Sequence, residues 1–204
     1  MSVSRRVLLT LPLAVALAGR TATAADAAPA QEIGRFYAVL LAVMKAGKQL
    51  SFAGRYARLA PAITEAYNLP LMTRLAVGPG WRQLSAAQQQ RLTAAFTRYT
   101  VSEYASRFDG YSGERFEVTP TASANPNGLL VASRMIKPDG EAISFNYLMR
   151  QDSVGVWKVI DVYVSGSISE LATRRAEFTA VLHRAGAEGL VQELDRRIAA
   201  LRTG

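Results

Sequence analysis

The 204-residue chain contains no cysteine and only one histidine, and both shortages exclude classes of chemistry. Without cysteine there is no thiol nucleophile, no disulfide and no thiolate ligand for a metal. The histidine, His183, stands beside Arg184 near the end of a helical pattern, where a cation that faces water is the simplest interpretation. Gly78-Pro79-Gly80 is not followed by the Gly-Lys-Ser/Thr of a phosphate-binding loop. The sequence therefore predicts no metal site and contains no familiar catalytic motif.

A concentrated basic surface is also missing. The chain has 24 lysines and arginines against 16 acidic residues, for a net charge of +8, but the basic residues are scattered among acidic ones. Its aromatic residues fall on apolar stripes and do not alternate with lysine and arginine, as they do in many nucleic-acid-binding surfaces. We therefore expect no nucleic-acid partner.

The chain has one long hydrophobic run, and it lies at the N-terminus. Arg5 and Arg6 precede the apolar run 7–18, and the small residues 22–25 offer a cleavage site. The run is too short for a bilayer, which needs about 20 apolar residues. We predict that residues 1–24 are a signal peptide, either of the twin-arginine type or an ordinary secretory signal. An uncleaved N-terminal anchor is the alternative.

Cleavage near Ala24 removes three arginines and no acidic residue, so the net charge falls from +8 to +5. An exported protein without cysteine fits the bacterial periplasm, where a well-packed core replaces disulfides. The remaining residues, 25–204, have the length of one domain. Half of the chain is hydrophobic, which is enough for a core and for an internal apolar cavity.

The spacing of apolar residues predicts helices at both ends of this domain. Ser85 and Gln88 form a capping box that begins a long helix. Pro61 is expected to stand in the first turn of a helix, and Gly186 to interrupt the last one. The predicted helical segments are residues 31–44, 51–67, 69–75, 85–108 and 167–201.

Between these helices the apolar period changes to two, which indicates strands. In the last strand, Trp157, Val159, Asp161 and Tyr163 are expected to share one face. Consecutive strands flanked by blocks of helices are typical of an α+β fold. We expect a curved antiparallel sheet of about four strands with helices packed on it, an NTF2-like cone that encloses an apolar pocket. The predicted strands are residues 115–119, 129–136, 142–150 and 156–164.

Asp161 and Arg175 stand out because each is predicted to point inward. Ile168, Leu171, Arg175 and Phe178 follow helical spacing, so Arg175 is placed on the apolar face and Arg174 outside it. A buried ion needs a partner, and Asp161 on the preceding strand is the favoured one. Two alternatives remain open: Arg175 binds the anionic group of a ligand, or Asp161 is a general base of the ketosteroid-isomerase type.

Several tyrosines lie on these apolar faces, and each buried hydroxyl needs a hydrogen-bond partner. An apolar cavity edged by such groups suits an amphiphile, with its hydrocarbon inside and its polar head at the mouth. Each candidate residue for the cavity wall also has a simple interpretation as ordinary core. The candidates are Leu71, Met72, Leu75, Tyr104, Phe108, Tyr147, Trp157, Tyr163 and Ile168.

Several motifs, in this order and spacing, suggest a family. They are Phe52-Ala53-Gly54-Arg55-Tyr56, Trp81-Arg82-Gln83-Leu84-Ser85, residues 157–162 (WKVIDV), residues 165–169 (SGSIS) and residues 175–178 (RAEF). With them the chain resembles the MlaC/Ttg2D periplasmic phospholipid-binding (toluene-tolerance) family, and most closely the members associated with hopanoid biosynthesis. The resemblance covers nearly all of residues 25–204.

The resemblance implies a monomeric periplasmic shuttle, without enzymatic activity or cofactor. Such a protein carries a lipid, with the tails buried, between an inner-membrane ABC transporter complex and an outer-membrane lipoprotein complex. The family has an aspartate and an arginine where Asp161 and Arg175 stand, but Arg174 replaces a common tyrosine. The cargo is therefore either a phospholipid or a hopanoid-type lipid. A structural subunit without lipid cargo is a further alternative, as is an enzyme that uses Asp161.

Overall fold

The computed structural model describes residues 24–203, so the predicted signal peptide lies outside the described residues except for Ala24, where the first helix begins. Two short 3-10 helices, η1 (Gly47–Gln49) and η2 (Gly78–Gln83), connect longer ones. The α-helices are α1 (Ala24–Lys45), α2 (Phe52–Ala66), α3 (Leu69–Val77), α4 (Ala86–Arg107) and α5 (Glu170–Thr203).

Seven antiparallel strands form one open sheet around the long strand β5. On one side β5 pairs with β3 and β4, which in turn pair with β2 and β1. On its other side β5 pairs with β6, which pairs with β7. The strands are β1 (Arg115–Val118), β2 (Ser123–Asn125), β3 (Gly128–Val131), β4 (Ser133–Ile136), β5 (Ala142–Gln151), β6 (Trp157–Val164) and β7 (Ile168–Ser169).

The α+β class is confirmed, but the expected number of about four strands is wrong. Strands β2 and β7 have three and two residues, too few to show an alternating pattern. The predicted strand 129–136 divides at Ala132 into β3 and β4, which pair with opposite ends of β5. At this division the Ser133 hydroxyl donates a hydrogen bond to the Phe145 carbonyl of β5. Nothing in this open sheet confirms the NTF2-like cone.

The prediction that Asp161 and Tyr163 share the face of Trp157 and Val159 is wrong because β6 contains a β-bulge. Its register to β5 pairs Met149 with Val159 but Leu148 with Asp161, so Ile160 is an extra residue. An extra residue reverses the alternation of the side chains that follow it. Val159 therefore shares its face with Val162, while Asp161 lies on the opposite face.

The helices follow the predictions except at Pro61 and at two helix starts. Helix α1 begins at Ala24 and not at residue 31, and residues 168–169 form β7 and not the first turn of the last helix, which begins at Glu170. Ser85 and Gln88 form the predicted capping box of α4, and Gly186 interrupts α5 with φ 65° and ψ −172°. Pro61, however, lies inside α2, because that helix already begins after Ser51, whose side chain accepts the N–H of Gly54. Among the described residues, no helix is long and apolar enough to cross a membrane.

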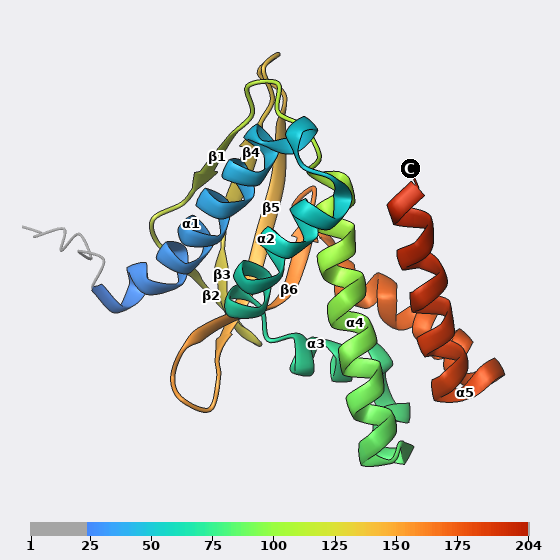
Figure 1. Cartoon of the computed structure of the whole chain (residues 1–204). Coiled ribbons are helices and arrows are strands. Elements are labelled where there is room, and N and C mark those ends of the chain that lie inside the picture. The colour runs from blue at the N-terminus through green and yellow to red at the C-terminus, as the bar shows by residue number, and fades with distance from the viewer. Residues whose placement is uncertain (1–23, 204) are drawn as a thin grey trace, which may run out of the picture.

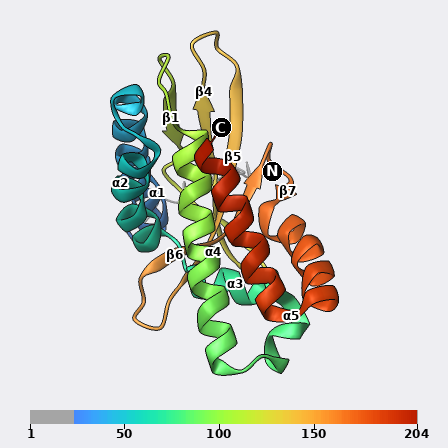
Figure 2. The same cartoon turned by 45° about the vertical axis from the view of Figure 1, so that its right-hand side comes forward.

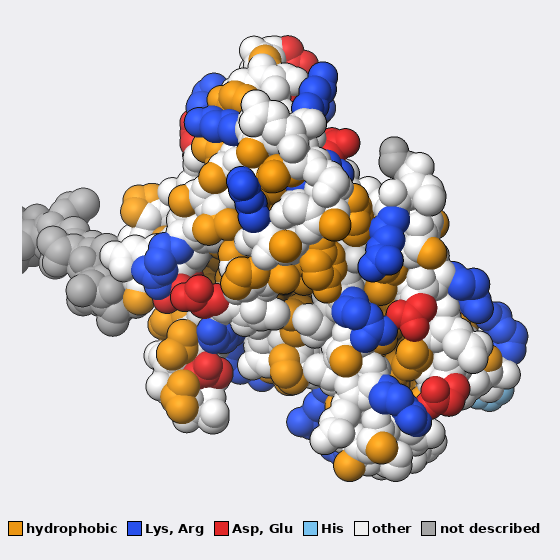
Figure 3. Space-filling view, in the orientation of Figure 1, with side chains coloured by type: hydrophobic (Ala, Val, Ile, Leu, Met, Phe, Trp, Pro, Cys, Tyr) orange, Lys and Arg blue, Asp and Glu red, His pale blue; other side chains and the backbone are white. Residues whose placement is uncertain are grey.

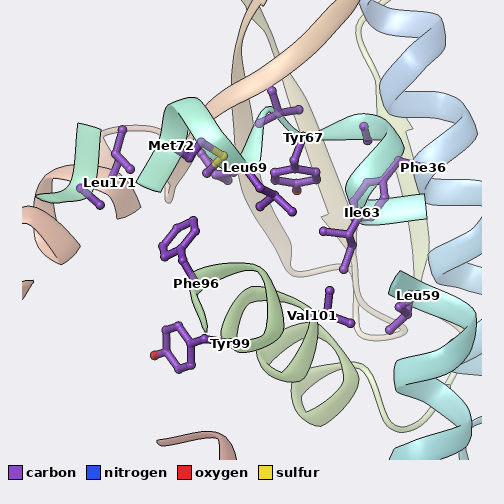
Figure 4. Packing of buried hydrophobic residues seen from close by; sticks show 14 of the residues in the cluster. Phe36, Leu59, Ile63, Tyr67, Leu69, Met72, Phe96, Tyr99, Val101 and Leu171 are labelled. Atoms are coloured by element: carbon purple, nitrogen blue, oxygen red, sulfur yellow. The ribbon is translucent and has the colours of Figure 1, made fainter. Parts of the chain in front are cut away.

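The helices pack in a layer against the sheet. Helices α1 and α2 lie over its strands, and the C-terminal half of α5 runs beside α4 (Figures 1 and 2). Tyr67, at the end of α2, lies in the core between Phe36 of α1 and Met72 of α3 (Figure 4). On the face of Figure 3, hydrophobic side chains gather over the middle, where α2 lies, and charged side chains lie around them. This layer leaves a cavity between helices and sheet.

Candidate functional site

A cavity of about 310 Å³ lies between the sheet and helices α1, α4 and α5. Its volume is at the lower end of the range of ligand pockets, about 300–1,000 Å³. One wall consists of side chains that alternate along β5 and β6, and the others come from the helices. The apolar wall residues are Leu40, Met72, Phe96, Phe108, Phe116, Ile143, Phe145, Val162 and Val164.

Four tyrosines, from four different elements, also line the cavity: Tyr37, Tyr67, Tyr104 and Tyr147. The Tyr67 and Tyr104 hydroxyls lie 2.5 Å apart, and the Tyr37 hydroxyl lies 2.7 Å from Ser133 Oγ. The Tyr147 ring packs against that of Tyr37, with ring centres 5.8 Å apart. The hydroxyls of Tyr37, Tyr67 and Tyr104 thus have hydrogen-bond partners inside an apolar site.

Burial makes the ionised form of these tyrosines unfavourable, because a phenolate loses its hydration inside the protein. It raises the pKa of Tyr37 to about 12. The pKa values of Tyr67, Tyr104 and Tyr147 are raised further above the usual 10, with burial as the largest cause in each case. The cluster is therefore neutral at physiological pH and supplies hydrogen-bonding groups without charge.

Charged residues line the cavity only where α4 meets the start of α5. They are Glu103 and Arg107 on α4 and Glu170 and Arg174 on α5. Arg174 bridges Glu103 at 2.5 Å and Glu170 at 3.4 Å, and its guanidinium lies 4.9 Å from the centre of the Tyr99 ring. Arg107 contacts Glu103 at 3.3 Å. This group of four residues is called the charged edge below.

The charged edge extends from the interior to the solvent. The side chains of Glu103 and Arg174 are 10% and 13% exposed, whereas those of Glu170 and Arg107 are 32% and 61% exposed. The cavity is thus amphipathic, with an apolar interior and a charged, accessible edge. Such a site can hold hydrocarbon inside and place a polar group at the edge.

The structure places four of the nine candidate wall residues on the cavity: Met72, Tyr104, Phe108 and Tyr147. The other five do not line it. Leu71 and Leu75 lie by separate surface grooves, and Ile168 is 57% exposed. Trp157 packs against the core elsewhere, and the bulge in β6 turns Tyr163 to the opposite face.

Asp161 is buried, but it does not pair with Arg175. Its carboxylate accepts hydrogen bonds from the backbone N–H groups of Val162 (2.8 Å) and Leu171 (3.1 Å), and from the Ser169 hydroxyl (2.6 Å). Ser169 in turn accepts the N–H of Ala172. Asp161 therefore joins β6 to the first turn of α5, where a carboxylate also interacts favourably with the helix dipole.

The predicted positions of Arg174 and Arg175 are reversed. Arg175 is exposed, and its Nε donates to the Leu75 carbonyl at 3.0 Å. The apolar stripe of α5 that contains Leu171 and Phe178 packs beside α3 and α4, where Phe178 contacts Phe96. Arg174, one position earlier, consequently faces Glu103. Arg175 lines a shallow groove with Arg74, Arg82 and Trp81.

Sequence reasoning missed the charged edge and much of the sheet wall. The alternation of Ile143, Phe145 and Tyr147 was recognisable, but not which face of the sheet encloses a cavity. Glu103 and Arg107 stand four residues apart on α4, which is the spacing of a helical ion pair. That signal is common on exposed helices, so it did not indicate a site. Among the described residues, no group of histidine and acidic side chains could hold a metal.

Comparisons with known proteins agree with this fold. A solved structure of a phospholipid-binding protein from Ralstonia solanacearum, in complex with a phospholipid, matches with a TM-score of 0.73 and 26% sequence identity. The match covers 86% of this chain and 98% of that chain. The family model of the MlaC protein matches residues 35–196. Since that match spans most of the chain, the protein belongs to the MlaC family.

Proposed function

We propose that this protein binds a phospholipid, with acyl chains in the 310 Å³ cavity and the headgroup at the charged edge. The observation that carries the proposal is the amphipathic lining, which matches the two halves of a phospholipid. The related protein from Ralstonia solanacearum, which contains a bound phospholipid, supports it. A cavity at the lower end of the ligand-pocket range implies that the walls must move apart to admit two chains.

The proposed role is that of a periplasmic shuttle. Membership of the MlaC family and the N-terminal signal pattern support a periplasmic location, with cleavage near Ala24. Residues 25–204 form one lipid-binding domain, and the protein acts as a monomer. The protein exchanges its lipid with an inner-membrane ABC transporter complex and an outer-membrane lipoprotein complex. A binding protein of this kind needs no cofactor and catalyses no reaction.

Two alternatives have less support. A hopanoid-type lipid is a rigid, mostly apolar cargo without the phosphate of a phospholipid, so it matches the arginines of the charged edge less well. An enzyme that uses Asp161 as a general base would need that carboxylate in the cavity. Asp161 instead accepts three hydrogen bonds at the junction of β6 and α5, and it is not a wall residue. A structural subunit without cargo would not need the cavity.

Native mass spectrometry of the purified protein, followed by lipid extraction, tests the proposal. Val164→Trp fills the cavity from β6 and should reduce phospholipid loading more than about 5-fold. Tyr163→Trp is the matched control, because the Tyr163 side chain lies next to Val164 on the same strand but on the face that points away from the cavity. We expect normal loading in that variant. A wild-type protein that carries no lipid, or loading unaffected by Val164→Trp, would contradict the proposal.

A further inference from the structure

The charged edge contains two arginines and two glutamates, and this balance bears on the headgroup. The four charges sum to zero, and all four residues line the same cavity. A site built to attract an anion would carry an excess of positive charge. Here each arginine already has a carboxylate partner, so a headgroup with one negative charge alone would meet two glutamates as well as two arginines.

The four residues are not equally available to a ligand. Arg174 is held by Glu103 at 2.5 Å and stacked over Tyr99, so this inner pair is fixed. Arg107 contacts Glu103 at only 3.3 Å, and Glu170 contacts Arg174 at only 3.4 Å. Both outer residues are also the more exposed members of the edge. A ligand can therefore replace the outer contacts without breaking the inner pair.

From this arrangement we infer that the site selects a zwitterionic headgroup that carries a primary ammonium, as in phosphatidylethanolamine, over an anionic one. Arg107 binds the phosphate, and the Glu170 carboxylate accepts hydrogen bonds from the ammonium. The inference rests on the proposed function and names its lipid class. A glycerol headgroup offers Glu170 no ammonium, while its phosphate still lies near two carboxylates. Because contacts between exposed charges contribute little individually, the preference should be modest.

The test uses the purified protein, stripped of lipid and incubated with vesicles that contain equal amounts of phosphatidylethanolamine and phosphatidylglycerol with identical acyl chains. Mass spectrometry of the extracted lipid then gives the ratio of the two species bound. We expect about a 3-fold excess of the ethanolamine lipid in the wild type. Glu170→Gln should bring the ratio close to one, and Arg107→Gln should reduce loading of both lipids.

Glu188→Gln is the matched control, since Glu188 forms an exposed ion pair with Arg91 and does not line the cavity. It should keep the wild-type ratio. Melting temperatures of all variants verify that each is folded. Equal binding of the two lipids by the wild type, or an unchanged ratio in Glu170→Gln, would overturn the inference but not the proposed function. The absence of either lipid from the wild type would overturn both.

Discussion

At the scale of single residues, the position of an arginine decides what it contributes. Arg174 and Arg175 are neighbours with the same chemistry, yet one lies in a buried ion pair and the other at the surface. The first fixes Glu103 beside the cavity, and the second only bonds the end of α3 through the Leu75 carbonyl. Sequence spacing suggested the opposite assignment. The two residues therefore form a natural pair for a stability test.

Arg174→Ala should destabilise the protein by about 3 kcal/mol, because it leaves the buried Glu103 carboxylate with one long contact to Arg107. Arg175→Ala should cost less than about 1 kcal/mol, since it removes one hydrogen bond at an exposed site. For a domain of this size these values correspond to shifts in Tm of roughly 6–12 °C and less than about 4 °C. Thermal unfolding measures both. Equal Tm shifts in the two variants would show that the buried Glu103 carboxylate does not need Arg174 as its partner.

At the scale of secondary structure elements, the interruption of α5 at Gly186 brings its second half against α4. Ion pairs between the two helices join Arg98 to Asp195 at 2.8 Å and Arg91 to Glu188 at 2.5 Å. The apolar stripe of Leu190, Leu194 and Ile198 is buried there. Since α4 carries much of the cavity wall, this packing supports the site.

Gly186→Ala should destabilise the protein by about 1–3 kcal/mol. At φ 65° and ψ −172° the backbone occupies a region that is essentially restricted to glycine. A Cβ at this position would meet no atom within 4 Å, so the cost is one of backbone strain alone. Gly34→Ala is the control: its Cβ also meets nothing, but it lies inside α1 and should stabilise by about 0.5–1 kcal/mol. Urea unfolding measures whether each variant is more or less stable than the wild type. A Gly186→Ala variant as stable as the wild type would contradict the argument from backbone strain.

A comparison of the predicted and observed elements shows which features could be predicted from the sequence. Long periodic helices and the capping box at Ser85 were predictable, because local signals determine them. The bulge at Ile160 was not, since it is defined by the pairing of β6 with β5. That one extra residue moved Tyr163 away from the cavity and Asp161 to the junction with α5. The candidate site was therefore predicted only in part, at Met72, Tyr104, Phe108 and Tyr147.

At the scale of the whole molecule, the same buried tyrosines line the cavity and contribute to the stability of the fold. Tyr37, Tyr67, Tyr104 and Tyr147 come from distant parts of the chain and meet between helices and sheet. The Tyr37 hydroxyl joins α1 to Ser133 of β4, and the Tyr67 and Tyr104 hydroxyls join the end of α2 to α4. Their aromatic rings also contact one another: Tyr37 and Tyr147 have ring centres 5.8 Å apart. Anything that ionises this cluster must therefore weaken the fold as well as the site.

Alkaline pH should do this. Folding raises the pKa of Tyr37 to about 12, and raises those of the other three, so above pH 10 the unfolded chain loses protons that the folded protein keeps. Stability is thus unaffected by these groups below about pH 9 and falls as pH rises beyond 10. Each tyrosine contributes a slope of up to about 1.4 kcal/mol per pH unit, and the four together up to about 5.

Urea unfolding between pH 8 and 11.5 measures that slope. Tyr147→Phe removes one titrating hydroxyl, so its slope above pH 10 should be shallower by up to about 1.4 kcal/mol per pH unit, whatever its stability at pH 8. Tyrosinate absorbance offers a second readout, since the four buried groups should ionise only together with the loss of helical circular dichroism. Ionisation of all tyrosines at pH 10 in a protein that remains folded would show that the cluster is open to solvent. A stability slope that depends on these hydroxyls would instead show that the wall of the cavity is part of the core on which the fold depends.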